Sequence, residues 1–211
     1  MSSYSPISIL KIYEDWLVCE KPAGLLSVPG KGPDKQDCLY SRLLKEYPEL
    51  LVVHRLDQAT SGLMVWARNK ESQRDLSRQF EQRLIRKEYE ALIPALPGTA
   101  GQREGEIRLH QRLDVENRPL QIVDEELGKL SVTRWKIVGQ EPSGFWRIRL
   151  YPETGRTHQL RLHMAHCGCP IAGDRLYGGR DAERLALHAA LLGFSDPAGG
   201  EAVILESPVP F

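Results

Sequence analysis

The sequence predicts an α+β fold, with a mixed, largely antiparallel sheet and flanking short helices. Many short segments alternate apolar and polar residues, as strands do. Only a few segments show the spacing of an amphipathic helix. The two kinds of segment lack the regular alternation that is typical of a parallel sheet. No linker or repeat interrupts the chain, so a single domain over residues 1–211 is expected.

The first third of the chain is expected to contain strands, a loop and a short helix. Residues 7–19 alternate like a strand, and the glycines and prolines of 21–33 predict a loop after it. A short helix is predicted over 37–47, where no breaker occurs before Pro48. The apolar run at 62–67 indicates a buried strand.

The clearest predicted helix covers residues 70–84. Leu76, Phe80 and Leu84 recur at every fourth position, which places them on one buried face. The alternation of residues 87–93 then predicts a strand.

The rest of the chain is expected to contain a hairpin and two more helices. After a loop at 97–105, segments 131–138 and 145–151 resemble paired strands, with turn-forming residues between them. Thr157 is predicted to cap a short helix that runs to about Ala165. Another helix is expected over 181–192, and the end of the chain is expected to be extended.

The composition is that of an ordinary soluble protein, with 41% hydrophobic and 27% charged residues. No apolar run approaches the roughly 20 residues of a membrane span, and the N-terminus shows no secretion signal. Four scattered cysteines form no obvious disulfide framework, so the cytoplasm is the expected compartment. The net charge of zero argues mildly against nucleic-acid binding, but basic residues gather at 68–87 and 147–161 and can form a basic face.

Asp57 is the leading candidate for a catalytic group. It follows His54-Arg55-Leu56 in a turn between two apolar strands, where a carboxylate is costly unless it is paired or hydrogen-bonded. A guanidinium is the natural partner because it stays charged and matches a carboxylate with two donors. Arg156, at a glycine-preceded turn, is a candidate for that partner. The alternative is that Asp57 merely caps its own turn.

Five segments, in order along the chain, resemble the RluA family of pseudouridine synthases. The longest runs from His54-Arg55-Leu56-Asp57 to Thr60-Ser61-Gly62, which resembles the family signature around its catalytic aspartate. The other four are Lys21-Pro22-Ala23-Gly24, Lys87-Glu88-Tyr89, Gly155-Arg156-Thr157-His158-Gln159-Leu160-Arg161 and Pro170-Ile171-Ala172-Gly173-Asp174. Cys169 stands where the family usually has histidine, a change that is expected to be tolerated.

The resemblance implies that the chain isomerises uridine to pseudouridine within RNA, without a cofactor or a metal. Asp57 would act on the ribose as nucleophile or as base. Arg156 would keep Asp57 ionised, because a neighbouring cation lowers the pKa of a carboxylate. Tyr89 would lie against the uracil ring and assist proton transfer, and Leu160 would form an apolar floor.

The same resemblance implies how RNA would be held. A uridine inside a stem-loop must be flipped into the pocket, and Arg55 is the candidate wedge for the space it leaves. The adjacent His54 is also expected to contact the RNA. Basic groups on the predicted helix and after it would contact phosphates: Lys70, Arg74, Arg78 and Lys87. For each of these the alternative is an ordinary solvated face.

The first predicted strand begins close to Met1, so no N-terminal S4 RNA-binding domain is expected. This compact form resembles the RluA branch that modifies stem-loops of 23S rRNA and of the tRNA anticodon arm. A monomer is expected. The alternatives are a synthase for a different tRNA site and a non-catalytic RNA-binding module of the same fold.

Two further alternatives are weak. A zinc site would use His163, His166, Cys167 and Cys169, but a second well-spaced pair of ligands is missing from the sequence. A hydrolase would use Ser61 as nucleophile, but the glycine that opens the usual nucleophile motif is replaced by Ala59.

Overall fold

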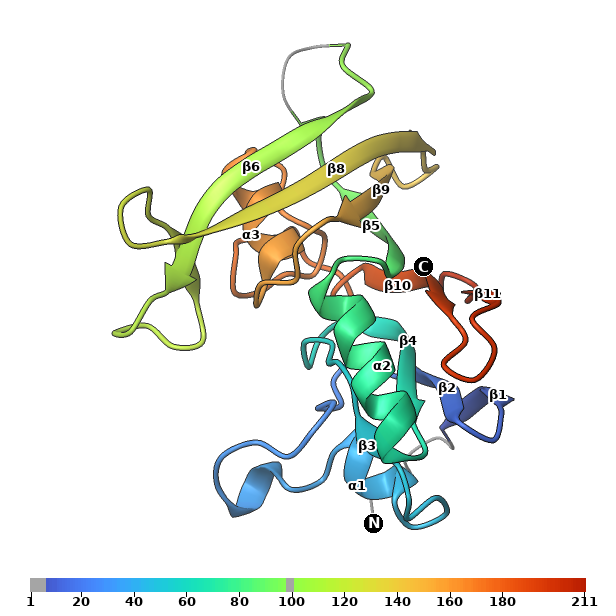
Figure 1. Ribbon diagram of the computed structural model, residues 1–211. Coiled ribbons are helices and arrows are strands. Elements are labelled where there is room, and N and C mark those ends of the chain that lie inside the picture. The colour runs from blue at the N-terminus through green and yellow to red at the C-terminus, as the bar shows by residue number, and fades with distance from the viewer. Residues whose placement is uncertain (1–6, 98–100) are drawn as a thin grey trace. The chain divides into compact units, whose positions relative to one another are not determined.

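The computed structural model describes residues 7–97 and 101–211 (Figure 1). Two segments lie outside the described residues. They are residues 1–6, on which the expectation of no secretion signal rests, and residues 98–100, which belong to the predicted loop at 97–105. The described chain forms two compact units. The first unit runs to Lys87 and includes Ala189–Pro208, and the second consists of Glu88–His188 and Val209–Phe211. A single domain over 1–211 stays a prediction.

The first unit is built on a sheet. Its strands are β1 (Ser8–Ile12), β2 (Trp16–Lys21), β3 (Leu51–Val52), β4 (Ser61–Ala67), β10 (Leu187–Ser195, from Ala189 onward) and β11 (Ala202–Glu206). They are ordered β1-β2-β4-β10, with β11 paired to β10 and β3 paired to β4. β2 and β4 are antiparallel, and Lys21 lies opposite Gly62 at the end of their register. The predicted strand over 7–19 is therefore a hairpin of two strands.

Helix α2 (Lys70–Glu81) packs against this sheet (Figure 1). It begins where the sequence predicts, because Asn69 caps it: the Asn69 Oδ1 accepts hydrogen bonds from the Ser72 and Glu71 amides at 2.8 and 3.0 Å. Its buried Leu76 joins an apolar core formed by residues of the sheet and by Ile85, which precedes strand β5 (Arg86–Ile93): Trp16, Val18, Leu63, Val65, Ala67, Ile85, Leu192 and Phe194.

The predicted end of this helix at residue 84 is wrong. The helix ends at Glu81, and Arg83 adopts a left-handed backbone conformation with φ of 61°. The chain therefore turns away, and Leu84 is 63% exposed instead of buried. Ile85, which is 5% exposed, packs into the core.

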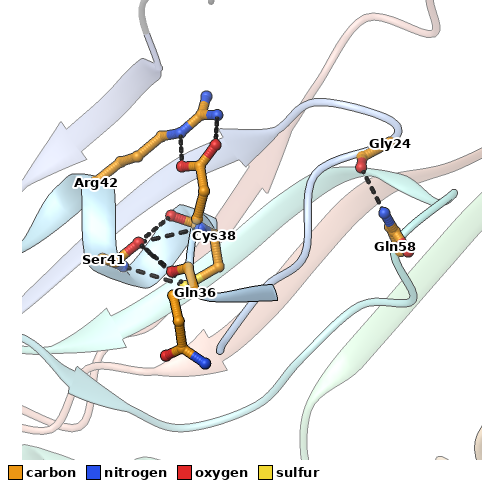
Figure 2. Close-up of polar contacts among 7 residues, drawn as sticks. Gly24, Gln36, Cys38, Ser41, Arg42 and Gln58 are labelled. Carbon is orange, nitrogen blue, oxygen red and sulfur yellow. Dashed lines mark hydrogen bonds and ion pairs between the residues drawn. The ribbon is translucent and has the colours of Figure 1, made fainter. Parts of the chain in front are cut away.

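Two short helical segments precede β3. They are the 3-10 helix η1 (Pro33–Lys35) and α1 (Leu39–Leu43). The predicted helix over 37–47 is therefore shorter than expected. Cys38 caps α1, with its Sγ accepting from the Ser41 amide at 3.3 Å (Figure 2).

The second unit contains an antiparallel sheet. Its strands are β5 (Arg86–Ile93, from Glu88 onward), β6 (Glu104–Leu113), β7 (Gln121–Val123), β8 (Lys129–Gln140) and β9 (Trp146–Pro152), in the order β5-β9-β8-β6-β7. The predicted hairpin is confirmed as β8 and β9, and the predicted strand over 87–93 as β5. The long strand β6, which pairs with β8, is not predicted from the sequence (Figure 1).

Helix α3 (Gln159–His166) is the helix of the second unit that the sequence predicts, but its start is different. His158, with φ of 54°, precedes the helix, and Thr157 does not cap it. The helix predicted over 181–192 is wrong, because strand β10 occupies Leu187–Ser195. The α+β class itself is confirmed. In the described part of the chain, no helix is long and apolar enough to cross a membrane.

Candidate active site

Asp57 lies in the loop of residues 54–60, between strands β3 and β4 of the first unit. The Thr60 amide donates to the Asp57 carbonyl at 3.1 Å and closes a tight turn. Gly62, with φ of 116°, lies so close to Ala189 that a Cβ atom there would overlap its backbone. Glycine is therefore required where the loop enters β4.

Buried Lys21 holds the loop on the C-terminal side of Asp57. Lys21 is 1% exposed, and its Nζ donates to the carbonyls of Leu25, Pro22 and Gln58 at 2.7, 2.8 and 3.0 Å. The Gly24 amide also donates to the Gln58 carbonyl at 2.8 Å. In return, the Gln58 side-chain amide donates to the Gly24 carbonyl at 3.0 Å (Figure 2). The segment that follows β2 is thereby tied to the residue next to Asp57.

Ser27 holds the other side of Asp57. Its buried hydroxyl donates to the Leu56 carbonyl at 2.7 Å and accepts from the Leu56 amide at 3.0 Å. A hydroxyl can do both at once. The backbone on each side of Asp57 is thus fixed by a buried side chain, which gives the carboxylate a defined position.

His54 supports the same loop. Its Nε2 accepts a hydrogen bond from the Val65 amide at 3.0 Å, and its ring stacks on Phe80 of α2 with centroids 4.5 Å apart. Burial, and to a smaller extent the charge of Lys87, lower the pKa of His54 to about 3. The ring is therefore neutral at ordinary pH, as an acceptor Nε2 requires. Its predicted contact with RNA stays a prediction.

The other predicted RNA contacts of the first unit lie on or near α2. Arg55 is exposed, and so are Lys70 and Arg74, whose side chains bond locally to Gln73 and to the Lys70 carbonyl at 3.4 and 3.2 Å. Arg78, in contrast, forms an ion pair with Asp75. Lys87 is half-buried, and burial followed by the charge of Arg83 lowers its pKa.

The second unit contains the remaining predicted site residues. Tyr89 is half-buried on β5, opposite Leu150 of β9. Leu160 is 7% exposed in the first turn of α3. Arg156 is exposed, and its Nε donates to the Leu130 carbonyl at 3.4 Å. The catalytic roles of Asp57, Tyr89 and Arg156 stay predictions.

Arg161 is the buried arginine of the segment that carries Arg156. It is 4% exposed, and its Nε and Nη2 donate to the two oxygens of Asp174 at 2.7 and 2.6 Å. Asp174 also accepts from the amides of Leu176 and Tyr177 at 3.1 and 3.3 Å. The guanidinium lies over the Tyr177 ring, 5.3 Å from its centroid. Arg161 and Asp174 lie in two of the segments that resemble the family, but the sequence alone assigns neither of them a role.

Tyr177 links three segments of the second unit. Its hydroxyl accepts from the Gln121 amide at 2.9 Å and lies 3.1 Å from the His158 Nδ1. His158 occupies the left-handed position before α3. The hydroxyl and ring of Tyr177 thus fix the start of α3 as well as the Arg161 guanidinium.

The zinc alternative gains no support from the described residues. Among them, no three His, Cys, Asp or Glu side chains gather as metal ligands would. The buried His163 instead places its Nε2 2.8 Å from the Ser131 hydroxyl, and Cys169 is a buried thiol.

Comparison with known proteins identifies relatives along the whole chain. The sequence profile of the RNA pseudouridylate synthase family matches residues 15–166. The dual-specificity RNA pseudouridine synthase RluA of Escherichia coli K12 is 40% identical over 220 residues, covering 100% of this chain and 99% of its own. RluA of Haemophilus influenzae is 41% identical over 206 residues, covering 95% of this chain and 93% of its own. The structure of human RNA pseudouridylate synthase domain containing 1 superposes with a TM-score of 0.80 at 29% identity, covering 100% of this chain and 87% of its own.

These similarities first define the class: the protein is an isomerase that makes pseudouridine in RNA. The chain belongs to the RNA pseudouridylate synthase family and, within it, to the RluA family.

Proposed function

We propose that the chain isomerises uridines in stem-loops of 23S rRNA and of the tRNA anticodon arm, with Asp57 as the essential carboxylate. The observation that carries the proposal is the 40% identity, over 100% of this chain, with a protein named for dual specificity. Because that similarity extends over nearly the full length of both chains, the surfaces that select RNA are included in it.

The rigid position of the Asp57 loop suits the chemistry. Isomerisation breaks the N1–C1′ bond, reorients the uracil and joins C5 to C1′, so one carboxylate must remain aligned with the ribose through several steps. The buried contacts of Lys21 and Ser27 supply that alignment. Asp57 acts as nucleophile or base, Arg156 keeps it ionised, and Tyr89 assists proton transfer at C5.

The RNA is held by residues of both units. Arg55 fills the space that the flipped base leaves, and Leu160 forms an apolar floor for the uracil. Four basic side chains contact the RNA phosphates: Lys70, Arg74, Arg78 and Lys87. His54 also contributes to RNA binding. Selection between stem-loops then depends on loop shape more than on base edges in a helix.

The protein acts as a monomer in the cytoplasm, without a cofactor. Its four cysteines are free thiols, as a reducing compartment favours.

The test is turnover of two short RNAs, one with the 23S rRNA stem-loop and one with the tRNA anticodon arm. The wild type is expected to convert a uridine in each, and Asp57→Asn is expected to convert neither while still binding both. Asp34→Asn, which makes the same change on the exposed segment η1, is expected to keep wild-type turnover. Conversion of only one RNA would remove the dual specificity, and turnover by Asp57→Asn would remove the assigned role.

A further inference from the structure

The C-terminus of α2 has an arginine where helices commonly place glycine. The Leu84 amide donates to the Gln79 carbonyl at 2.9 Å and the Arg83 amide to the Phe80 carbonyl at 3.2 Å. This pair of bonds is the Schellman closure, which needs a left-handed residue after the helix cap. Arg83 supplies it with φ of 61°, a conformation that disfavours residues with a Cβ atom. The exposed side chain is therefore kept at a conformational cost.

The Arg83 turn lies beside the loop that carries Asp57. Arg83 is bonded through its amide to Phe80, and the Phe80 ring stacks on His54 at 4.5 Å. Lys87 follows four residues later, at the start of β5. Its half-buried ammonium lies close enough to Arg83 that this charge, after burial, lowers the pKa of Lys87, and the Lys87 charge adds to the lowering of the His54 pKa.

No ion pair neutralises the positive charges of this turn in the described part of the chain. Among residues 7–97 and 101–211, neither Arg83 nor Lys87 has a carboxylate within ion-pair distance, and the same holds for Arg55. Three other arginines of the first unit are paired: Arg42 with Asp37 at 2.6 Å, Arg68 with Glu49 at 2.7 Å, and Arg78 with Asp75. Two cations held close together, one of them partly removed from water, favour an anion between or above them.

We infer that Arg83 and Lys87 form a binding site for one backbone phosphate of the substrate RNA, next to the Asp57 loop. The inference rests on the proposed function and adds Arg83 to it. The Arg83 side chain is exposed at the left-handed turn that follows the helix, where a phosphate can meet its planar donor group. The site positions the RNA backbone and reads no base.

The experiment compares Arg83→Gly and Arg83→Lys in the Asp57→Asn background, which prevents turnover. Binding of the tRNA anticodon-arm stem-loop is measured from low to moderate salt. Arg83→Gly is expected to weaken binding roughly 5–10-fold and to reduce the slope of log Kd against log salt by about 0.7–0.9. Arg83→Lys keeps the charge and is expected to keep most of the affinity and the slope.

Thermal unfolding separates this role from a structural one. Glycine relieves the left-handed strain, so the melting temperature of Arg83→Gly is expected to equal or exceed that of the parent protein. Arg42→Gln, which removes an arginine already paired with Asp37, is the matched control and is expected to leave the salt slope unchanged (Figure 2).

Unchanged affinity and salt slope in Arg83→Gly would overturn the phosphate site. If the wild-type enzyme still converts the stem-loop in that case, the proposed function stands without the phosphate site. The opposite result is also possible to recognise. If the salt slope of RNA binding depends on Arg83 but the wild-type enzyme makes no pseudouridine, the proposed function is overturned and the phosphate site stands.

Discussion

At the scale of single residues, the position of Asp57 depends on side chains that do no chemistry. Lys21 is the clearest example, because its ammonium is 1% exposed and bonds to three carbonyls from two segments of chain. A buried charge is tolerated only when its hydrogen bonds are supplied, so the contacts of Lys21 stabilise both segments at once. The Lys21-Pro22-Ala23-Gly24 motif thus has a physical role in this chain.

Lys21→Met keeps the length of the side chain but removes all three donors. The buried carbonyls then lose their partners, and a loss of about 2–4 kcal/mol in unfolding free energy is expected. Turnover is expected to fall further than stability alone explains, because the Gln58 carbonyl beside Asp57 is released. Differential scanning calorimetry and kcat on the stem-loop measure the two effects. Lys31→Met, at an exposed lysine nearby, is the control. Equal losses of stability and of kcat in the two variants would show that Lys21 does not hold the Asp57 loop.

Sequence patterns predict some of these residue-scale features and miss others. They predict Asp57 in a turn between two apolar strands, where the structure places it. They cannot show that Arg156 is exposed while Arg161, five residues on, is buried against Asp174. Both are arginines in one motif, and burial depends on segment 170–177, which is distant in sequence.

At the scale of elements, the start of α3 depends on a segment that has no regular structure of its own. Residues 173–177 supply Asp174 to Arg161 and Tyr177 to His158. The turn is tight: Gly173 has φ of 75°, and a Cβ atom there would overlap the Arg184 backbone. The contacts of this segment therefore hold the first turn of α3 in place.

Asp174→Ala tests whether this segment holds the first turn of α3. It leaves the Arg161 guanidinium buried without its carboxylate, and the expected destabilisation is about 3–5 kcal/mol. Asp37→Ala removes a carboxylate with the same two-donor geometry from Arg42, but the Asp37 side chain is 51% exposed, so a loss below about 1 kcal/mol is expected. Urea unfolding measures both. A small loss in Asp174→Ala would show that Arg161 is held by other contacts.

Two elements show why the fold could be predicted only in part. Residues 181–192 are rich in alanine and leucine and favour a helix by propensity, but Leu187–Ser195 pair as strand β10 because the sheet supplies partners on either side. The end of α2 was predicted too late because no glycine marks it; Arg83 takes the left-handed position instead. In contrast, Asn69 signals the start of α2 locally, and that prediction is confirmed.

At the scale of the whole molecule, three histidines with lowered pKa values set the response to acid. Burial is the main cause that lowers the pKa of His54 to about 3 and those of His163 and His188 to about 4. Below pH 6.5 the unfolded chain takes up protons at these rings and the folded chain does not. Their contribution to stability is therefore present above pH 6.5 and is lost as the pH falls toward 4.

The expected result is a cooperative loss of structure between pH 6.5 and 4. Each ring contributes at most roughly 3 kcal/mol, and two or three together approach the total stability of an ordinary domain. Melting temperature measured against pH tests this, and His163→Leu is expected to flatten the curve over the same range. A melting temperature that stays constant from pH 6.5 to 4 would contradict it.

The central claim concerns the function of the whole molecule, and one measurement tests it most directly. Pseudouridine is mapped in 23S rRNA and tRNA from cells that lack the gene, with and without restoration by wild type or by Asp57→Asn. We expect the deletion to remove at least one site in each RNA, and only the wild type to restore them. Sites that persist in the deletion strain, or that Asp57→Asn restores, would contradict the assignment of this activity to the Asp57 loop.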